Sequence, residues 1–392
     1  MKKLKGKLTI YVLFVVLIFV FVAYFIVPKI FVVSYSNIEI KNDPQISTEE
    51  DENKFTVTHI ETPNAVKGIY MTACVAATPS WREDLSKFIA DTELNSVVID
   101  IKDYSGTISL VNPDLQGDDV TGCRVADMME FVDILHKKGI YVIGRVTAFQ
   151  DPYYAKRHSD LAVKSKSTGG IWKDKNGLPF IDVGAKPYWD YIVDITNASY
   201  EMGFDEINFD YVRYPSDGNI SDMRFDWSVG TSTKAEMMEK FFSYLHQELK
   251  GSGVKTSVDL FGLVTVAQDD LGIGQVLERA LPYFDYVYPM VYPSHFAPGS
   301  GGFAKPAESP YGIVQYSMAG GIEKERAWNI ANGRATSTPS KLRPWLQDFD
   351  LGANYGVAEV QAQIKATYDV GLNGWLLWDA GNKYTRAALR EE

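Results

Sequence analysis

The feature that most constrains the fold is a regular alternation of short apolar runs and longer amphipathic segments between residues 67 and 380. The apolar runs have the length and residue types of buried strands, and the segments between them have the periodicity of surface helices. Eight strand–helix units in one stretch predict an α/β fold, a closed (β/α)8 TIM barrel. The runs cover residues 67–73, 96–103, 140–148, 206–214, 255–262, 285–292, 343–349 and 374–380, and the clearest amphipathic segments cover 126–138, 188–200, 234–249 and 357–370.

An open, doubly wound sheet is the alternative architecture. It needs fewer strands and usually has a glycine-rich, phosphate-binding turn after its first strand. Here residues 72–77, Thr-Ala-Cys-Val-Ala-Ala, follow the first run, and the chain has no phosphate-cradling glycine motif. The barrel is therefore favoured.

The amino-terminal segment predicts a membrane anchor. Residues 8–27 contain no charged side chain and are long enough to cross the hydrocarbon core of a bilayer as a helix. Four lysines precede this segment, which favours a cytoplasmic amino terminus and an extracytoplasmic remainder in a single-pass protein of the cell membrane. A cleaved signal peptide is the alternative, but its apolar core is shorter and no Ala-x-Ala site follows here. The lysines are Lys2, Lys3, Lys5 and Lys7.

The chain is accordingly expected to have five parts. A basic cytoplasmic tail (1–7) precedes the transmembrane anchor (8–33) and an acidic, flexible linker (34–65). The barrel domain follows (66–383), and a short carboxyl-terminal tail (384–392) ends the chain.

Charge and cysteine content limit the function classes. Beyond residue 33 the chain holds 34 basic and 50 acidic side chains, so binding to nucleic acid, which depends on neutralising phosphates, is not expected. Cys74 and Cys123 are too few for a disulfide framework or a thiolate metal cluster, and we expect both in the core. The five histidines show no ligand spacing, so neither a metal nor another cofactor is predicted.

Acidic residues at the ends of the predicted strands point to a catalytic site. Barrel active sites lie at the carboxyl ends of the strands, and hydrolysis of a glycosidic bond commonly needs two carboxyl groups. We predict that Asp210 is the nucleophile and Asp259 the proton donor, because their strands are neighbours and strand alternation turns both side chains inward, together with Asn208 and Ser257. The other strand-borne acids, assigned to substrate binding, are Asp100, Asp103, Asp348 and Asp379.

Cationic and aromatic residues complete the predicted site. Arg145 or Arg213 is expected to stabilise the ionised form of Asp210. Two long loops, 149–187 with Trp172 and 293–327, are expected to hold substrate. Candidates for stacking on sugar rings are Tyr288, Tyr292, Trp345, Trp375 and Trp378.

Several motifs, taken together, resemble a bacterial family of glycoside-hydrolase-like barrels that is catalogued as a domain of unknown function and grouped with amylase-like and galactosidase-like barrels. The resemblance covers about residues 66–383 and implies a TIM barrel with glycosidase activity. Amylase-like barrels usually carry Glu on strand five, where this chain has Asp259. The motifs are Lys67-Gly68-Ile69-Tyr70, Val98-Ile99-Asp100-Ile101-Lys102-Asp103 with Gly106, Gly144-Arg145, Phe209-Asp210-Tyr211-Val212-Arg213-Tyr214-Pro215, Asp259-Leu260-Phe261-Gly262, Tyr288-Pro289-Met290-Val291-Tyr292-Pro293 and Arg343-Pro344-Trp345-Leu346-Gln347-Asp348-Phe349.

The sequence thus predicts a membrane-anchored, extracytoplasmic glycosidase that acts on a cell-surface or environmental polysaccharide or oligosaccharide. A non-catalytic glycan-binding barrel in cell-envelope assembly is the alternative from another class. A polysaccharide deacetylase is a second enzyme candidate, disfavoured because its usual Asp-His-His metal set is not visible in the sequence.

Overall fold

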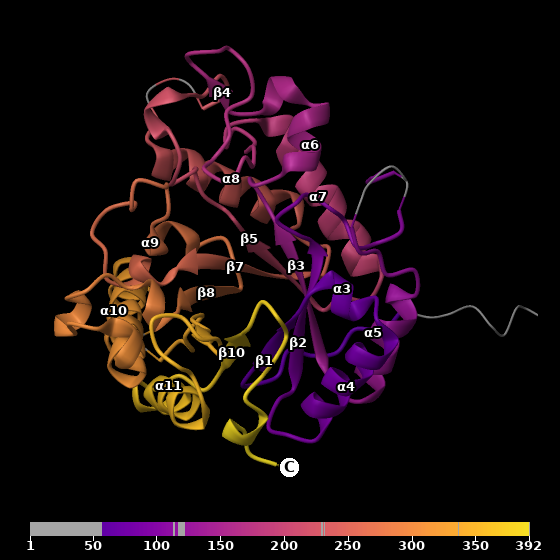
Figure 1. The fold of residues 1–392 in the computed structure, drawn as a ribbon, viewed down its shortest axis with the longest axis vertical. Coiled ribbons are helices and arrows are strands. Elements are labelled where there is room, and N and C mark those ends of the chain that lie inside the picture. Colours follow the sequence, from indigo (N-terminus) through magenta and orange to yellow (C-terminus); the bar gives the residue numbers. More distant parts are fainter. Residues whose placement is uncertain are drawn as a thin grey trace, which may run out of the picture. The chain divides into compact units, whose positions relative to one another are not determined.

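The computed structural model describes residues 57–112, 114–116, 122–228, 230, 232–335 and 337–391. Eight parallel strands close into a barrel in the order β1-β10-β9-β8-β7-β5-β3-β2, and β2 pairs with β1 (Figure 1). Each predicted apolar run forms one strand, which confirms the TIM barrel. The strands are β1 (Lys67–Met71), β2 (Ser96–Lys102), β3 (Tyr141–Thr147), β5 (Glu206–Asp210), β7 (Lys255–Phe261), β8 (Tyr286–Val291), β9 (Trp345–Gln347) and β10 (Trp375–Trp378).

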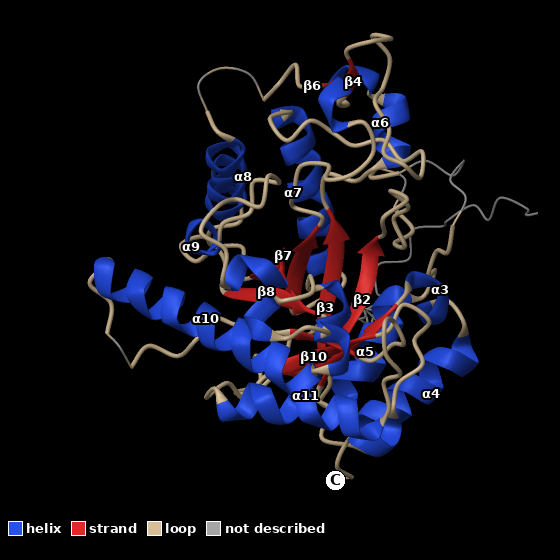
Figure 2. Cartoon of the chain, turned by 60° about the vertical axis from the view of Figure 1, so that its left-hand side comes forward, coloured by secondary structure: helices blue, strands red, loops and turns tan. Residues whose placement is uncertain are grey.

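Helices surround the barrel (Figures 1 and 2). Local sequence signals fix several of their starts; α8, for example, begins with a capping box in which Thr233 and Glu236 satisfy each other's backbone N–H groups. The α-helices are α3 (Ala73–Ala76), α4 (Pro79–Ala90), α5 (Met128–Lys137), α6 (Pro152–Arg157), α7 (Lys186–Glu201), α8 (Lys234–Glu248), α9 (Leu277–Ala280), α10 (Pro310–Ala331) and α11 (Val357–Asp369).

Helix α10 corrects the prediction that residues 293–327 form one long loop. Its glycines weaken the helical signal in the sequence, but they are needed for close packing. A Cβ on Gly320 would lie 2.7 Å from Cγ1 of Val266, and one on Gly321 would lie 3.1 Å from Cγ2 of Thr265. Only the part before Pro310 is therefore a loop.

Strand alternation divides the core into two layers. Outward residues such as Ile99 and Val142 pack against the helices, in one large apolar cluster. Inward residues form a second cluster inside the barrel, which includes Tyr70, Ile143 and Trp345. Polar side chains interrupt this inner cluster, and these side chains build the candidate site.

The segment between β3 and α7 forms an elaborated loop on the side toward which the arrows of β2 and β3 point (Figure 2). It contains α6 and the strand β4 (Lys164–Ser165), which pairs with β6 (Met223–Arg224). A fully buried ion pair between Lys102 and Asp151, 2.9 Å, ties the start of the loop to the barrel. Removing either partner would leave a buried charge unpaired, so this pair fixes the position of the loop.

Both ends of the described chain lie against the barrel. The Ile60 amide donates to Asp205, 2.8 Å, and the Thr62 hydroxyl contacts that of Tyr141, 3.0 Å. At the other end, Arg390 donates to Glu93, 2.6 Å. Residues 57–65, expected in the linker, and the expected tail thus pack on the barrel, whereas the cytoplasmic tail, the anchor and linker residues 34–56 lie outside the described residues.

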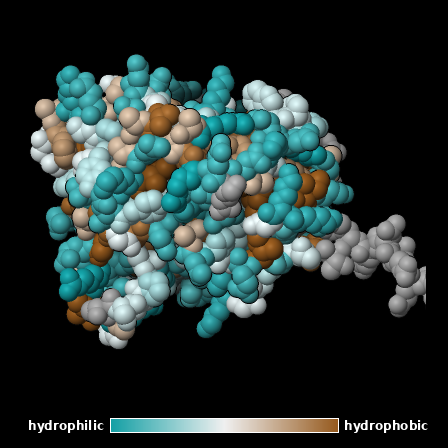
Figure 3. Space-filling model, turned by 90° about the horizontal axis from the view of Figure 1, so that it is seen from below, coloured by the Kyte–Doolittle hydropathy of each residue, from teal (hydrophilic) through white to brown (hydrophobic). Residues whose placement is uncertain are grey.

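In the part of the chain that the structure describes, no helix is both long and apolar enough to span a bilayer. The face shown in Figure 3 is mostly hydrophilic, with small, separate apolar areas. Such a surface is typical of helices that face solvent.

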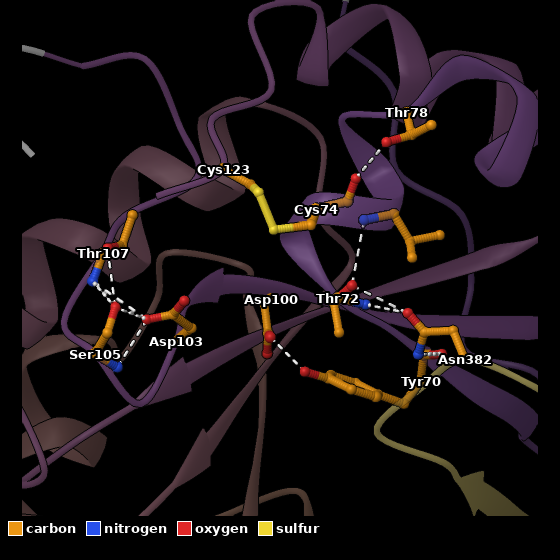
Figure 4. Close-up of a disulfide and its surroundings, with 11 residues drawn as sticks. Tyr70, Thr72, Cys74, Thr78, Asp100, Asp103, Ser105, Thr107, Cys123 and Asn382 are labelled. Atoms are coloured by element: carbon orange, nitrogen blue, oxygen red, sulfur yellow. Dashed lines mark hydrogen bonds between the residues drawn. A yellow bond between two sulfur atoms is a disulfide. The ribbon is translucent and has the colours of Figure 1, made fainter. Parts of the chain in front are cut away.

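The expectation that both cysteines are core residues is wrong. Cys74, in α3 directly after β1, forms a disulfide with Cys123 in the loop after β2 (Figure 4). The Cys74 residue is exposed. The disulfide joins α3 to the loop after β2, at the same end of the barrel as the carboxyl ends of β1 and β2.

Candidate active site

A pocket of about 370 Å³ opens at the carboxyl ends of the barrel strands. Its walls combine aromatic rings with three charged side chains, Arg145, Asp210 and Arg213. Apolar walls with few polar groups are typical of ligand sites, and this end of a barrel is where ligands bind. The remaining lining residues are Tyr211, Phe261, Gly262, Leu263, Met290, Tyr292, His295, Phe296 and Trp378.

Arg145 on β3 organises the carboxylates of the two neighbouring strands. Its Nη1 donates to Asp100 Oδ1 on β2, 2.6 Å, and its Nε donates to Asp210 Oδ2 on β5, 3.1 Å. All three side chains are buried. Asp100 pairs directly with Arg145 across β2 and β3. On β5 the residue paired with Arg145 is Asn208, so the long Arg145 side chain reaches two residues further along the strand to contact Asp210.

Asp259 on β7 lies beside Asp210. Phe209 pairs with Val258, so Asp210 and Asp259 are the next residues on their two strands. Asn208 Nδ2 and Trp345 Nε1 each donate to Asp259 Oδ1 at 2.9 Å, and Asp259 is only 1% exposed, beneath the pocket surface. Burial, together with the charge of Asp210, raises the pKa of Asp259 well above its usual range. Both effects favour the neutral form of this carboxyl group.

Asp100 is supported by Tyr70 on β1, whose hydroxyl donates to Oδ2 (Figure 4). The Tyr70 ring stacks on Trp378, with 4.0 Å between ring centroids. Burial raises the pKa of Asp100, although Arg145 opposes the shift. Tyr70 thus connects a pocket wall to the charged centre.

The backbone turns sharply after Asp210. Tyr211 adopts a left-handed conformation with φ of 51°, and its amide donates to Asp210 Oδ1. A left-handed conformation of a bulky residue costs about 1–3 kcal/mol and often occurs at functional sites. Here it orients the Asp210 carboxylate and brings Arg213 into the same pocket wall.

Two of the stacking candidates lie outside the pocket: Trp345 donates to Asp259, and Trp375 packs in the large apolar cluster. The other residues that the sequence assigned to the site divide into three groups. Asp210, Arg145, Arg213, Tyr292 and Trp378 line the pocket. Asp100, Asn208 and Asp259 lie in the hydrogen-bonded layer beneath it.

The third group, of five residues, does not line the pocket. Asp103 accepts hydrogen bonds from Ser105 in its own turn (Figure 4), and Asp379 does the same with the amide of Lys383. Asp348 accepts from Thr385 and so holds the carboxyl-terminal segment.

Trp172 and Tyr288 complete this third group. Trp172 is 3% exposed in a small cluster of the loop between β3 and α7, and it donates to the Asn219 carbonyl. Tyr288 lies inside the barrel, where it donates to Glu206 at the opposite end of β5 from Asp210.

The sequence did not identify four aromatic residues of the site as candidates for contact with sugar: Tyr70, Tyr211, Phe261 and Phe296. Tyr70 and Phe261 could have been found from alternation in β1 and β7, which turns both inward. Tyr211 and Phe296 depend on how the chain folds beyond the strand ends, and no local pattern in the sequence reports that. Among the described residues, no group of three or more His, Cys, Asp or Glu side chains is placed to hold a metal ion.

The family model described as "Putative glycosyl hydrolase domain" matches residues 68–384, which span the whole barrel. The chain belongs to this glycosyl hydrolase family. The expected family resemblance is thereby confirmed, and the pocket is the candidate active site of a glycosidase. No curated protein matches this glycosyl hydrolase domain in sequence.

Solved structures with TM-scores above 0.5 share the barrel fold. The PgaB (BpsB) glycoside hydrolase domain from Bordetella bronchiseptica is similar with a TM-score of 0.56 at 14% identity, over 80% of this chain and 94% of that one. The α-L-fucosidase isoenzyme 2 from Paenibacillus thiaminolyticus has a TM-score of 0.51 at 10% identity, over 83% of this chain and 47% of that one. A hypothetical protein from Ruminiclostridium thermocellum is 29% identical over 52% of this chain and 98% of that one, with a TM-score of 0.44.

Proposed function

We propose that this glycosyl hydrolase domain cleaves O-glycosidic bonds in a cell-surface or environmental polysaccharide by a two-carboxylate mechanism. The observation that carries the proposal is the adjacency of Asp210 and Asp259, two carboxyl groups in different electrostatic environments. Asp210 is ion-paired with Arg145 at the pocket surface, whereas Asp259 has a raised pKa. A two-carboxylate mechanism needs one protonated carboxyl group as the acid and one ionised carboxylate as the nucleophile.

Asp210 is the group that acts on the anomeric carbon in this proposal. It is the acidic residue of the pocket lining, and Arg145 and the Tyr211 amide hold both of its oxygens. A carboxylate fixed in this way can attack the anomeric carbon or stabilise the positive charge that develops there. The aromatic walls, Trp378 and Tyr292 among them, supply surfaces on which sugar rings stack.

Asp259 is the proposed proton donor. Its two hydrogen bonds from described residues both go to Oδ1, which leaves Oδ2 to carry the proton. A neutral acid beside the reacting bond protonates the leaving oxygen and later accepts a proton from water.

We propose that the domain works outside the cytoplasm. The Cys74–Cys123 disulfide supports this, because disulfides persist in oxidising compartments and are rare in the cytosol. The apolar, uncharged residues 8–27 behind four lysines support a single-pass anchor with the same orientation. The two observations are independent, since one is chemical and the other concerns sequence outside the described residues.

The test is a screen of the purified full-length protein, in detergent, for sugar released from a panel of cell-wall and plant polysaccharides. Release of reducing sugar from at least one polysaccharide supports the proposal. Binding to polysaccharides with no release from any of them would instead identify a glycan-binding barrel.

A further inference from the structure

Arg213 is a cation in the pocket wall that the proposed chemistry does not use. It follows Asp210 by three residues, after the left-handed turn at Tyr211. Its guanidinium carbon lies 5.3 Å from the ring centroid of Tyr211, 5.5 Å from that of Phe261 and 5.6 Å from that of Phe180. Three aromatic rings thus hold the guanidinium in place at the pocket.

Most donors of Arg213 have no partner among the described residues. Only Nη1 donates, to the Tyr214 carbonyl at 3.3 Å and to the Ser216 hydroxyl at 3.1 Å. The Nε and Nη2 groups, which form one edge of the guanidinium, donate to no described residue. That edge presents two parallel N–H groups, which is the arrangement that binds a carboxylate through two hydrogen bonds.

Arg213 also lacks an ion pair within the described chain. No described carboxylate oxygen lies within 4.0 Å of its nitrogens. Arg145, by contrast, is neutralised by Asp100 and Asp210. Arg213 is half-buried, and partial burial among the aromatic rings lowers its pKa, because removing a cation from water without a counter-ion is unfavourable. An anion in the pocket would relieve that cost.

We propose that Arg213 binds a carboxylate of the substrate, so that the preferred glycan carries an acidic sugar close to the cleaved bond. This inference rests on the proposed function, because it names the substrate class of the same pocket. One planar guanidinium edge matches one carboxylate. Since the chain has a formal net charge of −11, a densely charged polyanion would be repelled, and a glycan with isolated carboxylates fits better.

The test compares matched pairs of oligosaccharides. One member of each pair contains a single hexuronic acid, and the other is its carboxyl-reduced, neutral counterpart. Binding of both to the full-length protein in detergent is measured by calorimetry for the wild type, Arg213→Gln and Arg213→Lys. Arg326→Gln, which changes an exposed arginine on α10, is the matched control, and thermal unfolding checks that every variant is folded.

The wild type is expected to bind the acidic member of at least one pair about tenfold or more tightly than its neutral partner, as a charge-assisted hydrogen bond allows. Arg213→Gln should abolish the preference without weakening the neutral partner, Arg213→Lys should keep part of it, and Arg326→Gln should keep all of it. A wild type with no preference in any pair, including one that binds neither member, overturns the inference. So does a folded Arg213→Gln that retains the preference.

The binding experiment distinguishes a failure of this inference from a failure of the proposed glycosidase function. An Arg213-dependent preference without any bond cleavage would refute the glycosidase mechanism and leave the carboxylate site standing. Cleavage of neutral and acidic partners with equal efficiency would support the glycosidase mechanism and refute the carboxylate site.

Discussion

Arg145 donates two hydrogen bonds to a single oxygen of Asp210: Nε lies 3.1 Å and Nη2 2.5 Å from Oδ2. The remaining terminal nitrogen donates to Asp100. One buried guanidinium therefore joins side chains of β2, β3 and β5 at the end of the barrel where the pocket opens. The same contacts that position the proposed nucleophile also hold the barrel together.

Replacing Arg145 should therefore destabilise the fold as well as the site. Arg145→Gln leaves two buried carboxylates without their cation, and breaking such a pair costs about 3–5 kcal/mol. Arg145→Lys keeps the positive charge but not the planar, forked arrangement of donors, so we expect a smaller loss of stability. Urea unfolding of both variants measures this, with the exposed Arg326→Gln as control. A loss under about 1 kcal/mol for Arg145→Gln would contradict the buried network.

Asp259→Asn should change how stability depends on pH. Burial raises the folded pKa of Asp259, so its contribution to stability is present below the ordinary carboxyl pKa of about 3.9 and is lost as pH rises through the folded pKa. The asparagine side chain of the variant does not ionise, so its contribution to stability does not fall as pH rises. Unfolding free energies measured from pH 4 upward should shift in favour of Asp259→Asn by up to about 1.4 kcal/mol per pH unit. A difference that does not vary with pH would show that Asp259 ionises normally.

The catalytic role of Asp259 predicts a dependence on the leaving group. A proton donor matters most when the leaving oxygen is basic, and little when the leaving group is an activated phenol. Asp259→Asn should reduce kcat/KM on the natural glycan by about 10²–10⁴-fold, and much less on an aryl glycoside with a good leaving group. Equal losses on both substrates would assign Asp259 a purely positioning role.

The proposed location predicts the redox state of the cysteines in the cell. If intact cells are treated with a thiol-blocking reagent at lysis, Cys74 and Cys123 should be recovered as a disulfide by mass spectrometry. Reduction of the purified protein should lower its unfolding free energy by about 2–4 kcal/mol, because the bond restrains the unfolded chain. Recovery of two blocked, free thiols from cells would argue for a cytoplasmic domain.

The barrel and the position of Asp210 could be predicted from the sequence for a simple reason. Strands buried on both faces are continuous apolar runs, and a single acid at the end of such a run stands out. Alternation then places Asn208 and Asp210 on one face of β5, as the structure shows. These are local signals, and each covers a few residues.

Contacts between distant segments could not be predicted in the same way. Arg213 is near Asp210 in sequence, but the hydrogen bonds come from Arg145 on the neighbouring strand. The disulfide spans 49 residues and joins α3 to the loop after β2, and the approach of these two segments depends on the closed barrel. Asp348 and Asp379 follow strands as Asp210 does, yet only Asp210 lines the pocket. Asp348 accepts hydrogen bonds from Thr385 and Asp379 accepts one from Lys383, a distinction that the strand pattern does not contain.

The measurement that tests the account most directly is the turnover of Asp210→Asn on a glycan that the wild type cleaves, together with the affinity of both proteins for that glycan. Asparagine keeps the size of the side chain but removes the negative charge that would act on the anomeric carbon. The account predicts that kcat falls by several orders of magnitude, about 10³-fold or more, while affinity changes by only a few-fold. Wild-type turnover retained within about tenfold by a folded Asp210→Asn would contradict it.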